Sequence, residues 1–273
     1  MTTVTSGTAS RTGGVGPLLR AWRERRRVSQ LELALRAGSS ARHISFIETG
    51  RSRPSEEMVL RLAEHLDVPM RERNALLLAA GYAPYYPETP LDDPALGVVR
   101  DGIERLISGF EPYPALVVDG MYDVVAANRG VMALFDGVPE PLLTPPLNAV
   151  RLTLHPQGLA PRIRNLREWR GHLLEQMRRH IALHRSERLR ALYDEVAAFP
   201  VPEEPSGRPE EPAGPVAYFA LPMVIEHAGR TLSFVSSIST FNTPMDVTVA
   251  ELAVETLLPA DPATAEYLRS WLI

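Results

Sequence analysis

Residues 28–50 read VSQLELALRAGSSARHISFIETG, and the spacing of residue types in this stretch decides the fold of the first quarter of the chain. Ser29 and Ser40 each precede an amphipathic segment and can cap a helix N-terminus. Ala34 is small enough for two helices to cross closely, and Gly38 can adopt the positive φ that a tight turn needs. Four further residues recur at positions that would face a common core: Leu33, Ala37, Ile44 and Ile47. The pattern predicts two helices joined by a sharp turn.

The second helix of this pair would expose small, polar and basic side chains, which fit the major groove of DNA, about 12 Å wide. Arg42 can donate to a guanine through two N–H groups, and Ala41 or Phe46 can contact a thymine methyl group. Gln30, Arg51 and Arg53 suit phosphate contacts. We therefore predict nine DNA-binding residues: Gln30, Ser40, Ala41, Arg42, Ser45, Phe46, Thr49, Arg51 and Arg53. A helical bundle used for protein interaction would share the same packing, and only this exposed face separates the two interpretations.

The charge distribution agrees with a nucleic-acid-binding first quarter. The chain has 273 residues and a net charge of −4. Residues 11–73 hold 13 arginines and 8 acidic residues, a net charge of +5, and the remaining residues sum to −9. A basic segment on an acidic chain is typical of a DNA-binding module attached to another domain.

Caps and apolar spacing predict five helices over residues 16–82, the first beginning near Pro17 and the last ending at Gly81. Residues 1–15 are rich in Gly, Ser and Thr and are expected to form a disordered tail. Residues 83–94 contain four prolines and are predicted to be a linker.

From about residue 95 to residue 273 the pattern is that of a second domain. PALVVDG and YDVVAAN are two short β-rich runs, and Asn128 can cap the helix that follows. Residues 161–199 have helical spacing, and three strand candidates follow: 216–227, 231–241 and 247–258. Two strands, a helical block and three strands predict an α+β domain rather than a βαβ repeat.

The first domain resembles the XRE-type helix-turn-helix family over residues 16–82. Ser-Gln opens its second helix, Ile-Glu-x-Gly closes the third, and Arg-x-Pro follows. The resemblance implies a homodimer on an inverted-repeat operator, with half-sites about 34 Å or a multiple apart. Phe46 departs from the polar residue that is common at its position.

The second domain resembles the ligand-binding domain of MmyB-like transcription regulators. The resemblance rests on PALVVDGMYDVVAANRGVMALF, NAVRLTLHPQGLAPRIRNLREW and FNTPMDVTVAELAVETLLPAD, and departs at Leu166, where Trp is more usual. It implies a PAS-like, five-stranded antiparallel sheet with helices over one face, holding a small, apolar, fatty-acid-like ligand. We predict ten residues that line this ligand: Val118, Val124, Phe135, Ile163, Leu166, Trp169, Leu173, Phe219, Phe234 and Phe241.

Without the family resemblance, the residues of this domain allow more than one interpretation. The small side chains of 231–241 can line a cavity or face solvent, and the apolar stripe of 163–181 suits core packing or a pocket wall. Arg162 and Arg164 near His155 can meet a carboxylate head group, although exposed loop arginines are the expected state. As an alternative function, the domain is a dimerisation or protein-interaction module with no ligand.

Catalytic and metal sites find little support. His180 and His184 have the i, i+4 spacing of metal ligands, with His172 two turns earlier, but their segment is basic, HExxH is absent, and a solvated helix face is expected. No phosphate loop, dinucleotide fingerprint or nucleophile elbow is present. The chain has no cysteine. We therefore expect no enzyme, cofactor or metal, and, with no signal segment or apolar run of about 18 residues, a cytoplasmic protein without membrane insertion.

Overall fold

The computed structural model describes residues 14–184, 186–201 and 220–271. These residues belong to two units, and each unit is treated by itself. The first comprises Met1–Glu88 with Met245–Val247, and the second comprises Thr89–Pro244 and Thr248–Ile273. Among the described residues, none of the helices combines the length and the apolar character that a membrane crossing requires.

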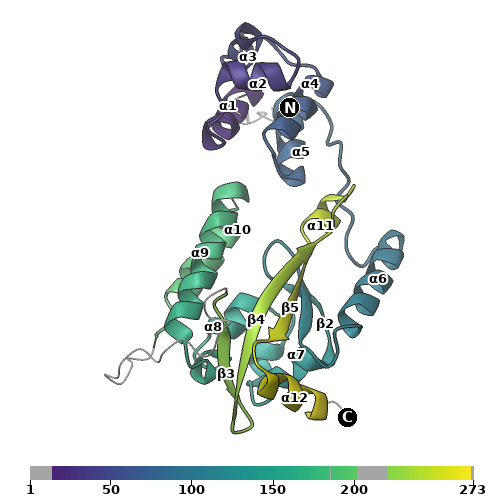
Figure 1. Ribbon diagram of the computed structural model, residues 1–273. Coiled ribbons are helices and arrows are strands. Elements are labelled where there is room, and N and C mark those ends of the chain that lie inside the picture. The colour runs from purple at the N-terminus through teal and green to yellow at the C-terminus, as the bar shows by residue number, and fades with distance from the viewer. Residues whose placement is uncertain (1–13, 185, 202–219, 272–273) are drawn as a thin grey trace, which may run out of the picture. The chain divides into compact units, whose positions relative to one another are not determined.

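The first unit contains the five predicted helices (Figure 1). They are α1 (Val15–Arg25), α2 (Gln30–Arg36), α3 (Ala41–Glu48), α4 (Glu56–His65) and α5 (Met70–Ala79). The hydroxyl groups of Ser29, Ser40 and Ser55 each accept a hydrogen bond from the backbone N–H three residues later, so serine caps begin three of the helices. The first helix begins two residues before the expected Pro17.

The turn between α2 and α3 has the predicted geometry. Gly38 has φ +62°, a backbone conformation that glycine adopts without strain. Ala34, Ile44 and Ile47 are all buried in the core of this unit. The same core brings α1 against α3 so closely that a Cβ on Gly16 would lie 2.4 Å from the carbonyl oxygen of Ile47.

The proline-rich segment after α5 is held by hydrogen bonds over its first part. The side-chain oxygen of Asn74 accepts from the backbone N–H groups of Tyr85 and Tyr86, and its amide donates to the carbonyl of Tyr86. Arg71 forms an ion pair with Glu88 at 2.7 Å. This part of the predicted linker therefore packs on α5.

The second unit is built on a five-stranded sheet in which all neighbouring strands are antiparallel, in the order β2-β1-β5-β4-β3 (Figure 1). Its strands are β1 (Ala115–Val118), β2 (Val124–Ala127), β3 (Met223–His227), β4 (Arg230–Thr240) and β5 (Ala253–Pro259). The α+β order and the five-stranded antiparallel sheet are confirmed. The likeness to the PAS fold stays a prediction.

The described residues of this unit also form helices and short 3-10 turns. They are η1 (Pro94–Leu96), α6 (Gly97–Ser108), α7 (Arg129–Leu134), η2 (Glu140–Leu143), α8 (Ala149–Leu154), η3 (Ala160–Arg162), α9 (Leu166–His184), α10 (Glu187–Ala197), α11 (Val247–Ala250) and α12 (Pro262–Trp271). Asn128 caps α7 as predicted, by accepting from the N–H of Val131.

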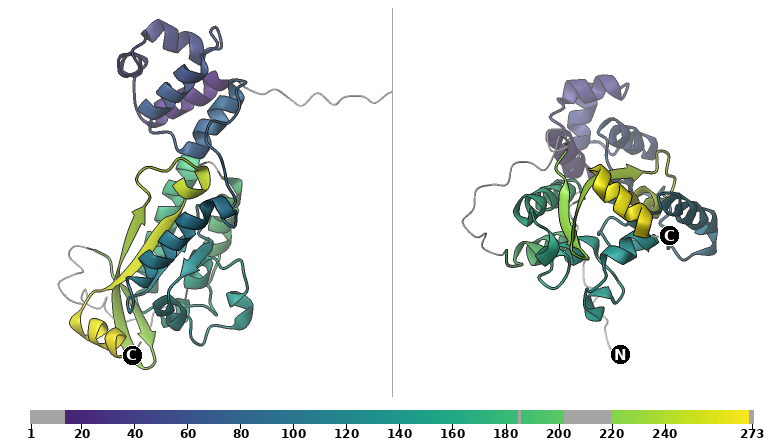
Figure 2. Two further views of the ribbon diagram at one scale, coloured as in Figure 1. Left: turned by 90° about the vertical axis from the view of Figure 1, so that its right-hand side faces the viewer. Right: turned by 60° about the horizontal axis from the view of Figure 1, so that its bottom comes forward.

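Helices cover both faces of the sheet, so the expectation of helices over one face is wrong. Ile103 and Ile107 of α6 pack on the face that carries Val117 and Val254. The opposite face, which we call the inner face, packs against α7, α8 and α9 in a larger apolar cluster. Figure 1 shows α6 and α9 on opposite sides of the sheet, and Figure 2 shows the unit from two further directions.

Two of the strand predictions need correction. The run 247–258 does not form one strand, because residues 247–250 form the short helix α11 and β5 begins only at Ala253. With residues 247–250 in a helix, Val247 and Leu252 are both buried. Burial of these side chains outweighs the strand preference of the β-branched residues. In the run 216–227, β3 begins at Met223, and residues 216–219 lie outside the described part of the chain.

Candidate DNA-binding and ligand-binding sites

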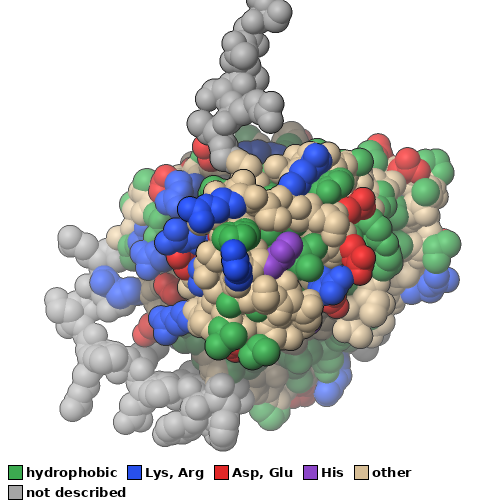
Figure 3. Space-filling view, turned by 90° about the horizontal axis from the view of Figure 1, so that it is seen from above, with side chains coloured by type: hydrophobic (Ala, Val, Ile, Leu, Met, Phe, Trp, Pro, Cys, Tyr) green, Lys and Arg blue, Asp and Glu red, His purple; other side chains and the backbone are tan. Residues whose placement is uncertain are grey.

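The N-terminal end of α3 presents the residues predicted to read DNA. Ser40 and Arg42 are exposed, Ala41 and Ser45 are half-buried, and Thr49 at the far end is exposed. On the face of the helical unit that Figure 3 presents, basic side chains are spread among uncharged ones. Small side chains at the start of a helix allow the helix to enter the major groove, and arginine can then reach the base edges.

Phe46 lies close to two arginines on this surface. The guanidinium carbon of Arg42 is 5.2 Å from the centre of the Phe46 ring, and that of Arg51 is 5.9 Å from it. Both distances fall within the range of cation–π attraction. The backbone N–H of Arg51 also donates to the carbonyl of Phe46 at 2.8 Å. Phe46 therefore brings two predicted DNA contacts, Arg42 and Arg51, to one aromatic ring.

A buried carboxylate that the sequence analysis did not single out fixes how α1, α2 and α3 meet. Arg23 donates to both oxygens of Glu48, at 2.6 and 2.9 Å, and the Gln30 amide donates to Oε2 at 2.8 Å. The hydrogen bonds to Glu48 raise the pKa of Arg23. Spacing alone gives no signal for this cluster, because its members are far apart in the sequence. The phosphate contact of Gln30 stays a prediction, and its amide already has one partner.

The two arginines after α3 differ in their surroundings. Arg53 donates to the backbone carbonyls of Ala80 and Gly81, at 3.1 and 3.4 Å, and lies over the ring of Tyr82. These contacts fasten the end of α5, so substitution of Arg53 would alter folding as well as any phosphate contact. Arg51 is exposed and gives a cleaner test of the phosphate role.

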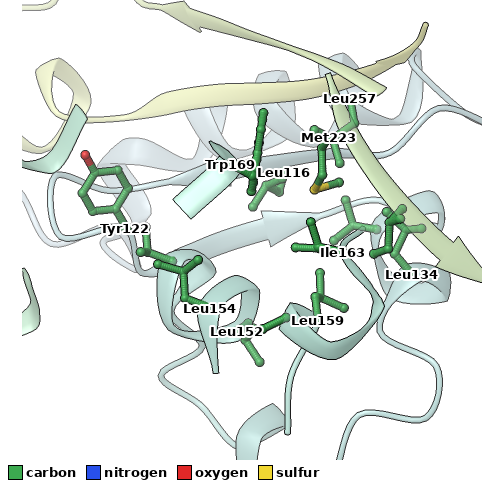
Figure 4. Packing of buried hydrophobic residues seen from close by; sticks show 14 of the residues in the cluster. Leu116, Tyr122, Leu134, Leu152, Leu154, Leu159, Ile163, Trp169, Met223 and Leu257 are labelled. Atoms are coloured by element: carbon green, nitrogen blue, oxygen red, sulfur yellow. The ribbon is translucent and has the colours of Figure 1, made fainter. Parts of the chain in front are cut away.

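In the second unit, most residues predicted to line a ligand meet in the apolar cluster on the inner face (Figure 4). Six are buried members of the cluster: Val118, Phe135, Ile163, Leu166, Trp169 and Phe234. Val124 and Leu173 are partly buried against it. Phe241, just beyond β4, is exposed, and Phe219 lies outside the described residues. The prediction that these residues line a ligand is untested.

Polar side chains are present on the same inner face, and two of them, Tyr122 and Glu255, were not singled out from the sequence. The Tyr122 hydroxyl lies 2.8 Å from Nδ1 of His180, and the two rings stack. In Figure 4 this hydroxyl points away from the labelled apolar side chains. Ser236 donates to Oε1 of Glu255 at 2.7 Å, and burial raises the pKa of Glu255. Burial, and after it the nearby Glu255 carboxylate, also raise the pKa of Tyr122.

The two arginines considered for a carboxylate head group are engaged elsewhere. Arg162 donates to the backbone carbonyls of Leu134 and Asp136. Arg164 is exposed and forms an ion pair with Glu226 at 2.6 Å. The expectation of an exposed loop arginine is therefore confirmed for Arg164, whereas Arg162 is half-buried.

Two of the three α9 histidines can be compared with the expectation of a solvated face, because the side chain of His184 lies outside the described part of the protein. His172 is exposed, but its ring packs on Trp169 at 5.6 Å, and His180 is half-buried against Tyr122. The expectation of a solvated face is wrong for His180, because the β1–β2 turn places Tyr122 against it. Within the described residues, no group of three or more acidic or histidine side chains has the arrangement of a metal site.

Comparison with known proteins identifies the family of each of the two domains. Residues 19–73 match the helix-turn-helix family model, and residues 99–270 match the model of the MmyB-like transcription regulator ligand binding domain. No curated protein matches the chain. The second match alone covers more than half of the chain. The chain therefore belongs to the MmyB-like transcription regulators, and is a DNA-binding regulator with a ligand-binding domain.

Proposed function

We propose that this regulator reads its operator with the N-terminal end of α3, and that a small apolar ligand in the second unit modulates operator binding. The ligand has a body like a fatty-acid chain. The protein acts as a homodimer on an inverted repeat, as the XRE-type resemblance implies.

The exposed start of α3 is the observation that carries the DNA-binding half. Ser40 caps the helix while Ile44 and Ile47 anchor it in the core. The opposite face is thereby left to Arg42 and its neighbours. A helix buried on one side and small and basic on the other suits major-groove contact.

The inner face of the sheet supports the ligand-binding half. Its cluster combines aromatic and aliphatic side chains with a few polar groups, which is the usual composition of a site for a small apolar molecule. The hydroxyl of Tyr122 and the carboxyl of Glu255 are polar groups at the edge of this apolar surface.

Selection of tight-binding DNA from a random library with the full chain identifies the operator. Mass spectrometry of a solvent extract of the purified protein then identifies any bound chain-like molecule. Operator affinity is measured with and without that molecule, or with saturating dodecanoic to hexadecanoic acids if none is extracted. The proposal expects a change of at least fivefold, the lower end of typical coupling between sites. An operator affinity that stays constant, together with no thermal stabilisation by apolar chains, supports instead a dimerisation or interaction module with a filled core.

A further inference from the structure

Helix α2 carries two leucines that the core of the first unit does not use. Leu33 and Ala34 are each 1% exposed and belong to that core, whereas Leu31 and Leu35 are 61% and 73% exposed. Because residues four apart lie on the same face of a helix, the two exposed side chains form one apolar stripe, which we call the α2 stripe. Exposed apolar side chains scattered singly are ordinary, but neighbours that share one face indicate an interaction surface.

Two charged side chains follow one flank of the α2 stripe. Glu32 and Arg36 each come one position after a leucine of the stripe, so both lie on the same side of it. They form an ion pair at 2.5 Å, and each side chain is 46% exposed. The stripe therefore has an acidic group beside its N-terminal end and a basic group beside its C-terminal end.

This order of charges is complementary to itself when two copies of α2 pack antiparallel. A two-fold axis perpendicular to both helices places Leu31 of each copy against Leu35 of the other. In an antiparallel helix pair equivalent flanks meet, so the same axis places Glu32 of each copy beside Arg36 of the other. An isologous interface requires a surface that is complementary to itself in this way. The partner that fits the stripe is therefore a second copy of this chain.

The α2 stripe is too small to hold two free molecules together. A stable interface buries about 800 Å² on each partner and involves about 20–30 residues a side. The stripe and its flank comprise four residues, and exposed ion pairs contribute only about 0.2–1 kcal/mol each. Such a contact becomes significant when both copies are already held side by side, because a short tether raises their effective concentration to about millimolar. For a DNA-binding protein, the DNA is that tether.

The α2 stripe stays available while α3 reads the operator. In a helix-turn-helix the first helix of the pair crosses the DNA backbone, and the second enters the major groove. Neither Leu31 nor Leu35 is among the nine residues predicted to contact DNA. Gln30, the one predicted contact on α2, is half-buried and donates to Glu48 of the core. A neighbour on the same DNA can therefore reach the stripe.

We propose that the α2 stripe is the contact between copies of this regulator bound at neighbouring operators, and that through it these copies bind DNA cooperatively. The inference goes beyond the proposed function. It rests on the DNA-binding half of that function, since the operators must hold the copies side by side, and it does not depend on a ligand.

Quantitative footprinting of the full chain on DNA with one selected operator, or with two at spacings that vary over about 12 base pairs, tests this assignment. At one spacing the wild type should bind the second operator at least about fivefold more tightly than an isolated operator, the lower end of typical coupling between sites. Leu31→Gln combined with Leu35→Gln should lose this gain and keep the affinity for one operator, because glutamine preserves helix propensity. The control Leu78→Gln replaces an exposed leucine of α5 and should behave as the wild type.

Reversal of charge tests the antiparallel pairing itself. Glu32→Arg places arginines opposite each other across the contact and should lower the cooperativity. Glu32→Arg combined with Arg36→Glu restores opposite charges across the contact and should recover the cooperativity. The quantity compared is the ratio of affinities for the second operator and for an isolated one, so a general change in DNA affinity cancels.

The outcomes separate this inference from the proposed function. Cooperativity that is absent at every spacing, or that survives in the double leucine variant, overturns the inference and leaves operator reading by α3 standing. A double leucine variant that loses affinity for one operator would place the stripe inside the homodimer and also overturn the inference. So would unchanged cooperativity with altered transcription from a promoter with one operator, which would assign the stripe to RNA polymerase. Failure of the wild type to select any operator overturns the DNA-binding half of the proposed function and the inference with it.

Discussion

Phe46 explains how a DNA-reading helix can carry an aromatic residue where a polar one is common. The guanidinium carbons of Arg42 and Arg51 lie 5.2 and 5.9 Å from the centre of its ring. Each long arginine side chain loses rotamer freedom when it binds DNA. A ring that holds both arginines in the free protein reduces this cost, so Phe46 acts through its neighbours.

Substitutions on this surface should separate base reading from phosphate binding. Arg42→Ala should weaken operator binding by about 1–3 kcal/mol and relax specificity at one base pair. Arg51→Ala should weaken all sequences alike and reduce the salt slope by about one. Fluorescence anisotropy with operator and scrambled duplexes at several salt concentrations measures both effects, and Phe46→Leu should show a weaker version of each. Arg188→Ala, exposed on α10, removes the same charge as a control. Identical behaviour of the two arginine variants would contradict the separate roles.

The half-buried Glu255 makes a prediction about pH. Burial raises its pKa in the folded state, so the folded protein holds this proton more tightly than the unfolded chain. The contribution of Glu255 to the free energy of unfolding therefore falls as the pH rises above the unfolded value of about 4.3.

Glu255→Gln removes the ionisable carboxyl, so the free energy of unfolding of the variant should not fall with pH in this way. The stability of the variant relative to the wild type should therefore be higher at pH 8 than at pH 5. Urea denaturation at the two pH values measures it, in the absence of ligand. The exposed Glu104→Gln should show no such difference. Equal effects of Glu255→Gln at both pH values would mean that the carboxyl is not perturbed as the structure indicates.

Among the elements, the crossing of α1 over α3 depends on one residue without a side chain. A Cβ on Gly16 would lie 2.4 Å from the carbonyl oxygen of Ile47 and 2.7 Å from that of Glu48. Backbone atoms cannot rotate away as a flexible side chain can, so the two helices would have to separate.

Gly16→Ala should therefore destabilise the first unit by about 1–3 kcal/mol, as overpacked cores do. Gly102→Ala is the matched control, because Gly102 lies within α6 and its added Cβ would meet nothing within 4 Å. The higher helix propensity of alanine should make that control neutral or more stable by up to about 1 kcal/mol. Thermal unfolding followed by circular dichroism compares the two variants. A Gly16→Ala protein as stable as the wild type would show that the helices cross less tightly.

The elements differ in how far their local sequence decides them. Serine caps and a turn glycine are local signals, and α2 and α3 begin at the expected residues. The segment 247–250 begins with three β-branched residues, which favour a strand, yet it forms α11 because this buries Val247 and Leu252. The local sequence pattern predicts an element reliably where caps fix the backbone. It fails where burial of side chains decides between a helix and a strand.

For the whole molecule, control of DNA binding by a ligand must be reciprocal. If saturating ligand changes operator affinity by some factor, saturating operator must change ligand affinity by the same factor, typically about 5- to 150-fold. Titrating ligand into the protein alone and into the protein–operator complex measures one factor, and operator binding with and without ligand measures the other. Arg42→Ala should weaken operator binding and leave ligand affinity in the DNA-free protein unchanged. Two unequal factors would show that ligand and operator are linked through a further equilibrium, such as dimerisation.

The sequence by itself determined the helix-turn-helix, the α+β order of the second unit and the apolar residues of the inner face. These follow from caps, turn residues and apolar periodicity, which act over a few neighbouring positions. Only the tertiary structure brought Glu48 to Arg23 and Gln30, His180 to Tyr122, and Glu255 to Ser236. The members of each cluster come from elements far apart in the chain, so the local spacing of residues does not predict these contacts. A buried polar group depends on long-range packing for its partners, so these contacts became visible only once the tertiary structure had formed.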